Sequence, residues 1–435
     1  MLIQFTVSNY KTFAEETKIS LVASKDSTYR DTNVFDSNFK YDLLKTAVIY
    51  GANASGKTKF IEALGFLKEI VFDSANYQST KKINATPFRL STQKINEPSL
   101  FEIIFIEDNV MYRYGFEITT EKVVSEWLFM RQNNSKPKEI ELFYREEQEF
   151  EFHPKHFKIK DLIDNNRIKT NSLLLSVADA SNVKLAKVVS KWINWQMQVI
   201  SGLKMDVYLE YTVNELSKDI NKKNILNFLK DADLEIIDLL PQMSKISELP
   251  KQIQEIIASK NQNKEDGNFF SDVKTFKKQY NQDNEFVGLE EFSMDNDESL
   301  GTRKYFALSA PIIDVLENGL ILVVDELDAS LHPNLTQKII ELFHSKETNP
   351  KNAQLIFNTH NTNLLNPSSN LFRRDQIWFV KKDHYGAASL YSLADFKTNE
   401  VRKDDNYEKD YIAGQYGAIP YLGDFETLKN KENGN

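Results

Sequence analysis

The order of hydrophobic and polar positions separates stretches with a strand pattern from stretches with a helical pattern. Residues 2–7 alternate in polarity and predict a strand near the N-terminus. Four further apolar or alternating runs follow the same pattern, at 19–23, 101–106, 110–118 and 123–130. The dipeptide Asp108-Asn109 separates two of these runs and predicts a hairpin turn. Together the runs predict an antiparallel layer of strands.

The middle of the chain has a mainly helical pattern between residues 155 and 260. Apolar residues recur at helical spacing from Val183 to Ile200, and helical segments are also expected at 211–231, 233–240 and 250–259. No heptad pattern is sustained, so a long coiled coil is excluded. Trp192 and Trp195 are expected in the core, with a binding surface as the alternative. The polar stretch 261–268 predicts a loop.

The last third of the chain alternates strands with helices. Strand-like runs at 273–280 and 285–292 precede a helix that opens near residue 298 and ends near Glu317. Apolar strands at 320–324, 354–358 and 376–380 then follow, with a helix at 335–343. Near-continuous apolar strands alternating with helices indicate a parallel sheet with helices on both faces. The pattern predicts four segments: an N-terminal part at 1–130, a mainly helical insertion at 131–268, a C-terminal part at 269–395 and a tail at 396–435.

A glycine-rich loop follows the apolar strand 47–50. The residues Gly51-Ala-Asn53-Ala54-Ser55-Gly56-Lys57-Thr58 match the pattern G-x-x-x-x-G-K-[ST] without a mismatch. The glycines allow a tight turn whose amide N–H groups converge on phosphate oxygens. Lys57 supplies a positive charge to the outer phosphates, and the Thr58 hydroxyl is a ligand for Mg²⁺. A plain glycine-rich turn is the alternative, against which the flanking strand and amphipathic helix argue. The loop therefore predicts a nucleotide site.

Later stretches of the chain complete this site in our prediction. The strand 319–324 ends in Asp325 and Glu326, and the carboxyl end of a parallel strand is where such a sheet binds ligands. Asp325 is expected to hold Mg²⁺ through water, and Glu326 to orient and deprotonate the attacking water. His360 follows another apolar strand and can donate a hydrogen bond to the γ-phosphate. A solvated turn for the acids and a structural role for the histidine are the alternatives.

The order of these pieces resembles the ABC-class ATPase heads of the SMC and RecF type. Another stretch contributes to the resemblance, Glu298-Ser299-Leu-Gly301-Thr302, which opens a helix. A serine and a glycine at the start of a helix can also bind an anion. The resemblance implies an α/β head with a mixed central sheet, an ATPase activity, and a homodimer that encloses ATP and Mg²⁺. Ser299 and Gly301 would then reach the partner's γ-phosphate, Asp328 would lie at that interface, and His360 would be the switch residue.

Two features depart from this family pattern. The sequence Ser-Leu-Gly-Thr replaces a fuller glycine-rich signature, and the usual glutamine-loop residue is not evident. Gln78 and Gln93 are the candidates for it. Assembly beyond the dimer and the choice between ATP and GTP stay open.

Within the class, the chain is similar to single-chain ATPases of bacterial anti-phage and abortive-infection systems, such as the RloA, AbiL and PARIS types. The similarity lies in the compact insertion and in residues 112–118, 376–380 and 411–420. Relatives with a fused nuclease have a further C-terminal domain, whereas about 55 residues follow Val380 here. The resemblance therefore implies a slowly hydrolysing switch that controls a separate effector, a nuclease or a toxin.

Composition narrows the alternatives. The chain has 435 residues, a formal net charge of −9 and no cysteine, so disulfides and thiolate metal sites are excluded. An acidic chain without a basic stripe does not favour the alternative of a RecF-like repair ATPase that binds DNA directly. No signal peptide or apolar run of about 18 residues is present, so a cytoplasmic protein without a membrane partner is expected. A transporter-type ATPase is disfavoured by the β-rich segment at 100–130.

Overall fold

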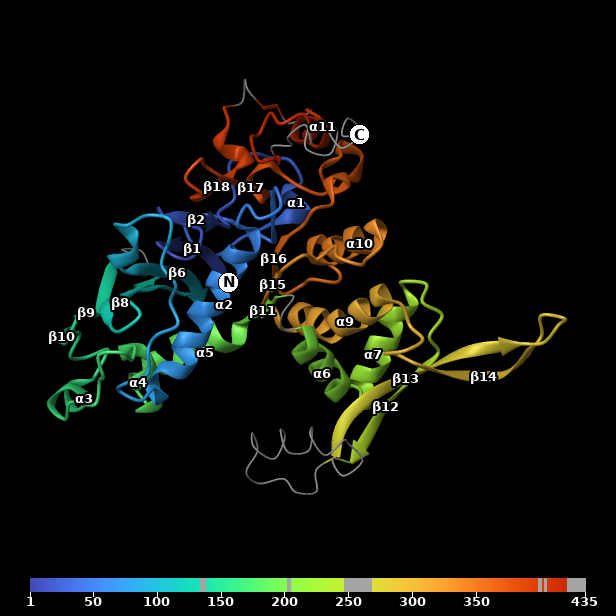
Figure 1. Ribbon diagram of the computed structural model, residues 1–435, viewed down its shortest axis with the longest axis horizontal. Coiled ribbons are helices and arrows are strands. Elements are labelled where there is room, and N and C mark those ends of the chain that lie inside the picture. The colour runs from blue at the N-terminus through green and yellow to red at the C-terminus, as the bar shows by residue number, and fades with distance from the viewer. Residues whose placement is uncertain (134–137, 202–204, 246–267, 398–400, 403–404, 421–435) are drawn as a thin grey trace, which may run out of the picture. The chain divides into compact units, whose positions relative to one another are not determined.

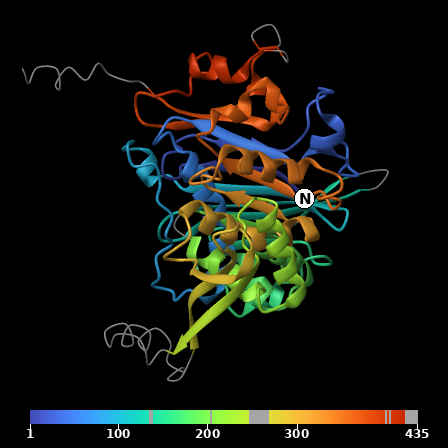
Figure 2. The same ribbon diagram turned by 90° about the vertical axis from the view of Figure 1, so that its right-hand side faces the viewer.

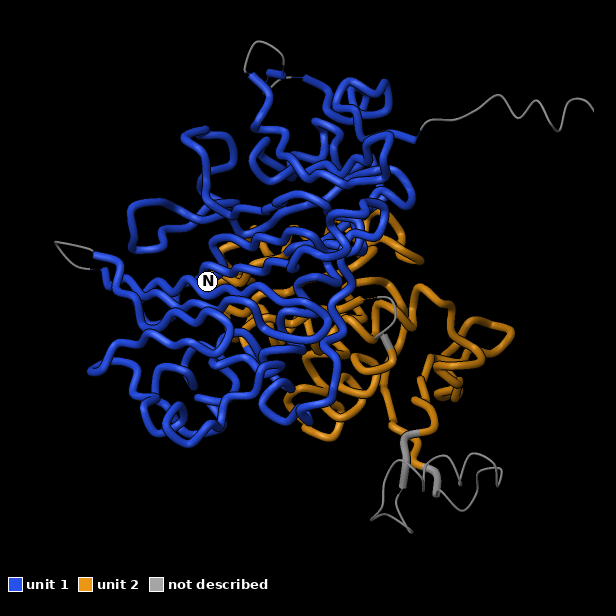
Figure 3. Tube along the Cα trace, turned by 60° about the vertical axis from the view of Figure 1, so that its left-hand side comes forward, with its two compact units in different colours: residues 1–195, 356–435 blue, residues 196–355 orange. Residues whose placement is uncertain are grey.

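The computed structural model describes residues 1–133, 138–201, 205–245, 268–397, 401–402 and 405–420. The chain divides into two compact units, one formed by Met1–Trp195 with Ile356–Asn435 and the other by Gln196–Leu355 (Figure 3). This division differs from the four segments predicted from the sequence. In particular, the segment 131–268, predicted to be mainly helical, contains several strands as well as helices.

The first unit contains a seven-stranded antiparallel sheet with the order β10-β9-β8-β7-β6-β1-β2 (Figure 1). Its strands are β1 (Leu2–Ser8), β2 (Thr17–Ser20), β6 (Ser99–Glu107), β7 (Val110–Ile118), β8 (Val123–Gln132), β9 (Glu139–Glu146) and β10 (Glu149–Phe152). Asp108 and Asn109 form the β6–β7 turn with φ of 49° and 58°, the left-handed region that a two-residue hairpin needs. The predicted antiparallel layer and its hairpin are therefore confirmed, while β9 and β10 were not predicted.

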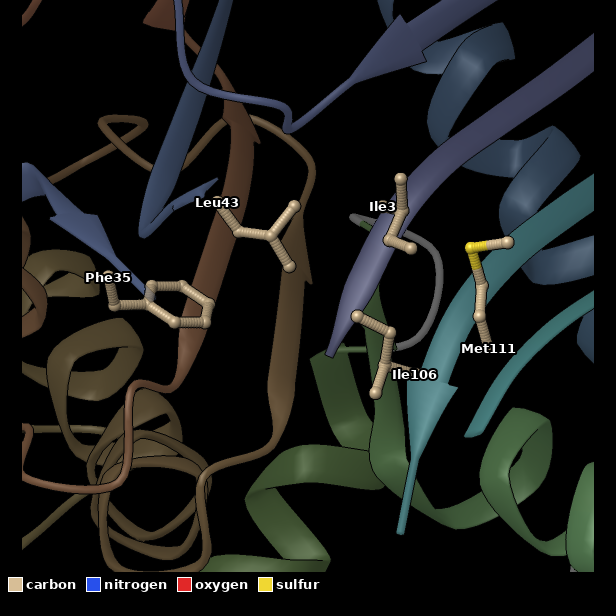
Figure 4. Close-up of a cluster of buried hydrophobic side chains, with 5 residues drawn as sticks. All are labelled: Ile3, Phe35, Leu43, Ile106 and Met111. Atoms are coloured by element: carbon tan, nitrogen blue, oxygen red, sulfur yellow. The ribbon is translucent and has the colours of Figure 1, made fainter. Parts of the chain in front are cut away.

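A small hydrophobic cluster joins a short hairpin to one face of this sheet. The hairpin consists of β3 (Val34–Phe35) and β4 (Leu43–Leu44), which pair antiparallel. Phe35 and Leu43 pack with residues of β1, β6 and β7 (Figure 4), and the cluster comprises Ile3, Phe35, Leu43, Ile106 and Met111. Burial of these side chains stabilises the segment 24–45, which by its polar, turn-rich composition has few other apolar residues.

The same unit contains the strand that leads into the glycine-rich loop. Strand β5 (Thr46–Gly51) is buried along its whole length and pairs in parallel with β17 (Ile377–Lys382). Strand β18 (Ala388–Ser392) adds to β17 in antiparallel direction, so the sheet is mixed. Strand β16 (Gln354–Asn358) lies on the other side of β5. The α/β fold with a mixed sheet and a separate antiparallel sheet, expected from the sequence, is confirmed.

Helix α2 (Lys57–Asp73) follows the loop and buries the face that its sequence spacing predicted. Its buried apolar residues include Phe60, Ile61, Leu64, Leu67, Ile70 and Val71. The other helices of this unit are short: α1 (Arg30–Asn33), α3 (Lys160–Asp164), α4 (Leu174–Ala180), α5 (Lys184–Lys191) and α11 (Tyr407–Ile412). A π-helical turn spans Trp192–Gln196.

The two tryptophans of this turn have different environments. Trp192 is 1% exposed and its ring stacks on Phe105 with centroids 3.8 Å apart, so its predicted core position is confirmed. Trp195 is 68% exposed, and the prediction that it lies in the core was wrong. The helical spacing that predicted both residues to face inward ends here, because a π turn shifts the following side chains around the helix axis.

We expect Trp192→Ala to lower the free energy of unfolding by about 3–5 kcal/mol, the usual cost of emptying an aromatic core site. Urea denaturation followed by far-ultraviolet circular dichroism measures this. The matched control, Trp195→Ala, removes an exposed ring of the same turn and should cost within about 0.5 kcal/mol. Equal losses in the two variants would contradict the assignment of Trp192 to the core.

In its described residues, the second unit contains two parallel strands, four helices and a three-stranded sheet. Strand β11 (Met197–Ile200) pairs in parallel with β15 (Ile321–Val324), residue 197 opposite 321. The helices are α6 (Met205–Glu215), α7 (Asp219–Lys230), α9 (Leu300–Asn318) and α10 (Pro333–His344). Gly319 ends α9 with φ of 68°, a left-handed conformation that favours glycine and turns the chain toward β15.

Strands β12 (Asp238–Lys245), β13 (Asn268–Tyr280) and β14 (Phe286–Ser293) form an antiparallel sheet that projects from the helices α6, α7 and α9 of the same unit (Figures 1 and 2). The strand predictions for β13 and β14 are confirmed. The helical prediction for 197–200 was wrong, because this stretch pairs with β15. The predicted helix 233–240 was also wrong, because residues 234–237 have no regular secondary structure and residues 238–240 pair with β13. The predicted helix 250–259 and the stretch 261–267 of the predicted loop lie outside the described residues.

Among the residues that the structure describes, no helix has both the length and the apolar character needed to cross a membrane.

Candidate nucleotide site

The glycine-rich loop is shaped by two positions at which the chain approaches other atoms too closely for a side chain. A Cβ atom on Gly51 would lie 2.5 Å from the Val380 carbonyl oxygen of the neighbouring strand. A Cβ atom on Gly56, whose φ is 121°, would lie 2.9 Å from the Thr12 hydroxyl. Between them Ala54 has a φ of 59°, so the sign of φ changes from residue to residue along this part of the loop. Such a backbone forms a concavity whose N–H groups can bind an anion.

Lys57 is buried inside this loop. Its Nζ atom donates hydrogen bonds to the carbonyl oxygens of Gly51 at 2.8 Å and Ala52 at 3.1 Å. Thr58 is the second residue of α2 and is half-buried. Helix α2 begins at Lys57, so the positive end of its dipole lies at the loop.

The donor set of the loop fits a bound phosphate. The Ser55 hydroxyl is buried within the loop and has no hydrogen-bond partner among the described atoms. A buried hydroxyl without a partner costs free energy, and a phosphate oxygen is a suitable partner for it. Asn53 and Ala54, by contrast, are exposed at the tip of the loop. The chemistry of the Lys57 amine and the Ser55 hydroxyl therefore fits a phosphate group.

His360 lies beside the strand that carries this loop. It follows β16 and is exposed. The residues on both sides of it are hydrogen-bonded to β5. The Thr359 N–H donates to the Ile49 carbonyl at 3.2 Å, and the Tyr50 hydroxyl donates to the Asn361 carbonyl at 3.1 Å. The first unit thus brings the segment of His360 to the end of β5, where Gly51 begins the loop.

The acidic pair lies at the end of β15 in the second unit. Asp325 is buried and its N–H donates to the Ile200 carbonyl at 2.8 Å, whereas Glu326 is exposed with a φ of 52°. Two hydrogen bonds close the turn that follows, from Ala329 N–H to the Glu326 carbonyl and from Leu331 N–H to the Asp328 carbonyl. The left-handed conformation of Glu326 turns the chain sharply, so Asp325 is retained in the interior while Glu326 faces solvent.

A lysine that the sequence analysis did not single out lies among these acids. Lys304, in α9, donates from Nζ to the Glu326 carbonyl at 2.5 Å. Burial lowers the pKa of Lys304, and the nearby carboxylates of Asp328, Glu326 and Asp325 oppose that shift. Its position in the second turn of a predicted helix gave no sequence signal, since only the fold places it against the acidic turn.

The signature segment opens helix α9. Ser299 is the N-cap residue, and its Oγ accepts a hydrogen bond from the Thr302 N–H at 3.1 Å. Ser299 and Leu300 are exposed, so this end of the helix faces solvent. Glu298, just before it, accepts hydrogen bonds from Thr275 Oγ1 at 2.9 Å and forms an ion pair with Lys277, both on β13.

Gly301 allows the start of α9 to approach the acidic turn. A Cβ atom on Gly301 would lie 2.5 Å from the carbonyl oxygen of Ser330. Because the clash would be with backbone, it cannot be relieved by a side-chain rotation.

We expect Gly301→Ala to displace one of these two segments and lower the free energy of unfolding by about 1–3 kcal/mol. Chemical denaturation of the full chain measures the loss. Gly288→Ala is the matched control, because a Cβ atom there meets no atom within 4 Å. A loss for Gly301→Ala no larger than that for Gly288→Ala would contradict the close approach.

The predicted site residues therefore fall into two groups. The first unit holds Gly51 to Thr58 together with His360, and the second unit holds Asp325, Glu326 and Asp328 together with Ser299 and Gly301. Gln78 and Gln93 are exposed; the side chain of Gln93 donates to Glu97 at 2.7 Å, and neither candidate gains support as a glutamine-loop residue.

Sequence reasoning also missed Thr12 as a neighbour of the loop. Its hydroxyl is buried beside Gly56 and has no partner among the described atoms, and its carbonyl accepts from the Ala388 N–H at 2.7 Å. The stretch Asn9 to Phe13 matches no pattern with an assigned chemistry, so the sequence gave no signal for Thr12.

A buried strand, a glycine-rich loop with an enclosed lysine, and a helix that starts at that lysine define a P-loop nucleotide-binding protein. Residues 47–366 match the family model described as "AAA domain, putative AbiEii toxin, Type IV TA system". The chain belongs to this family of P-loop ATPases.

Solved structures with a similar general fold include the SMC head domain from Thermotoga maritima, with 13% identity and a TM-score of 0.38 over 90% of this chain and 98% of that chain. They also include the recombination mediator protein RecF with ATP in the RecFOR pathway, with 13% identity and a TM-score of 0.32 over 90% and 97% of the two chains. A comparison with curated protein sequences gives no match. No residue role in this chain rests on these likenesses.

Proposed function

We propose that the protein is a Mg²⁺-dependent ATPase of low turnover that dimerises around two nucleotides and acts as a switch. The observation that carries the proposal is the loop itself, in which the buried Lys57 amine is held at the Gly51 carbonyl and the buried Ser55 hydroxyl has no partner among the described atoms. Both groups are suited to a phosphate oxygen. Lys57 would bind the outer phosphates, and Thr58 and Asp325 would hold Mg²⁺, which neutralises charge on the phosphates when it is bound.

The remaining residues would act on the γ-phosphate. Glu326 would orient the attacking water and accept its proton, since a carboxylate is a suitable general base for water. His360 would donate a hydrogen bond to a phosphoryl oxygen as negative charge develops on it. Ser299 and Gly301 would contact the nucleotide of a second protomer, with Asp328 at the same interface. The exposed start of α9 supports this role, because a segment that faces solvent is accessible to another subunit.

Light scattering coupled to gel filtration tests the switch. The protein is expected to shift from monomer to dimer with ATP and Mg²⁺, and to revert when EDTA removes the metal. Protein that neither binds ATP nor changes its assembly with it would refute the proposal.

The proposed biological role is control of a separate effector, a nuclease or a toxin, in bacterial defence against phage. The family description refers to a toxin and to a toxin–antitoxin system, which supports a role in a defence system made of two partner proteins. Co-purification with the product of the adjacent reading frame, in amounts that change with ATP, is the expected result. The alternative is a RecF-like ATPase that binds DNA directly, and salt-dependent binding of duplex DNA by the isolated protein would favour it over an effector switch.

A further inference from the structure

The backbone around Glu326 is held by hydrogen bonds on both sides. Before it, the Asp325 N–H donates to the Ile200 carbonyl of β11 at 2.8 Å. After it, the Glu326 carbonyl accepts two hydrogen bonds, one from the Ala329 N–H at 3.1 Å and one from the Lys304 Nζ at 2.5 Å. Because a peptide unit is planar, these bonds fix the peptide planes on either side of the Asp325-Glu326 pair.

The conformation of Glu326 needs such support. Its φ of 52° lies in the left-handed region, which costs free energy for a residue with a side chain and persists only where the surrounding structure holds it. Of the two donors to its carbonyl, Ala329 belongs to the acidic turn itself, residues 325–331. Lys304 therefore supplies the restraint from a separate element, helix α9.

The face of α9 that carries Lys304 lies against the acidic turn at a second point. Gly301 is three residues earlier and shares that face of the helix. It approaches the turn so closely that a Cβ atom on it would lie 2.5 Å from the Ser330 carbonyl oxygen. Ser299, the N-cap of the same helix, and Glu326 are thus parts of two segments that pack directly on each other.

We propose that Lys304 is a positioning residue: its amine fixes the backbone of Glu326 and so sets the position of the carboxylate that would accept the proton of the attacking water. The inference rests on the proposed ATPase activity and deepens it. The Glu326 side chain is exposed, so the protein controls its direction through the backbone from which it starts. A catalytic group misplaced by about 1 Å loses much of its effect. Lys304 would also link Glu326 to the start of α9, where Ser299 would contact the partner's nucleotide.

Lys304→Met tests this role, because it keeps an unbranched apolar stem and removes the amine. We expect kcat for ATP hydrolysis to fall about tenfold, since a hydrogen bond from a charged group is lost. The dissociation constant for ATP should stay within about twofold, because a positioning residue for the base acts on turnover and not on binding. Lys304→Arg keeps a cationic donor and should recover most of the lost kcat.

Lys338→Met is the matched control. Lys338 is an exposed lysine of α10 that pairs with Glu341 of its own helix at 3.5 Å, so both values should stay as in the wild type. An unchanged kcat in Lys304→Met, or a weaker affinity for ATP with unchanged kcat, would overturn the positioning role.

A double variant separates positioning from an independent effect. In a Glu326→Gln protein the proposed base is absent, so the addition of Lys304→Met should lower kcat no further. If the second substitution lowers kcat by the same factor in both backgrounds, Lys304 acts without Glu326 and the inference is wrong.

Backbone amide exchange of the peptide 324–331 tests the restraint without nucleotide. Mass spectrometry of the full-length Lys304→Met protein is expected to show faster exchange in this peptide and unchanged exchange in α2, which serves as the internal reference. Unchanged exchange in 324–331, or an equal acceleration throughout the chain, would contradict a local restraint. If the wild-type protein does not hydrolyse ATP, the proposed function fails, and the exchange measurement still decides whether Lys304 holds the turn.

Discussion

Lys57→Ala is expected to abolish ATP binding at micromolar concentrations. The Lys57 amine is enclosed by the loop and bonded to the Gly51 and Ala52 carbonyls, so it is held where outer phosphates would bind. A charge-assisted hydrogen bond to phosphate contributes about 1.5–3 kcal/mol, and its loss corresponds to a rise of about 10- to 100-fold in the dissociation constant. Lys57 is the one cationic side chain among residues 51–58, so we expect the rise in the dissociation constant to lie at the upper end of that range.

Isothermal titration calorimetry with ATP and Mg²⁺ measures the change. Lys59→Ala is the matched control, because Lys59 is on the same helix turn but its amine pairs with Glu62 at 2.8 Å. A dissociation constant within threefold of wild type for Lys57→Ala would show that the loop does not bind the phosphates as proposed. Thermal melts of both variants exclude unfolding as the cause of a loss.

Glu326→Gln is expected to separate ATP binding from hydrolysis. The amide keeps the size of the side chain and the left-handed backbone of residue 326, but it cannot accept the proton of the attacking water. General-base catalysis contributes about 10²–10⁴-fold, so kcat should fall by that factor while ATP affinity is retained. A dimer that forms with ATP should then persist for much longer than the wild-type dimer.

Single-turnover hydrolysis and light scattering on the same sample measure the two effects. Glu347→Gln, an exposed carboxylate in the same unit, is the control for a change of net charge and should hydrolyse ATP normally. Hydrolysis by Glu326→Gln at the wild-type rate would refute the general-base role.

Sequence periodicity predicted the long elements well and the short ones poorly. The strands β1, β6 and β7 and the helices α2 and α9 were all expected, because each has enough residues to define a period. Met197–Ile200 was expected to be helical, since a four-residue apolar run fits either pattern. Its pairing with β15, a strand about 120 residues later, decides in favour of a strand. Trp195 was assigned to the core by the same extended helical spacing.

The sequence by itself determined the residues of the phosphate loop, because the spacing of two glycines, a lysine and a threonine defines a local backbone shape. It also determined the order of strands and helices around the acidic pair and His360, since each follows its own apolar strand. The tertiary structure alone decided which distant residues surround these groups: Thr12 at Gly56, Lys304 at Glu326 and Tyr411 at Tyr50. Contacts between residues far apart in the chain depend on how the strands pair and on where the helices pack, and no local pattern records either.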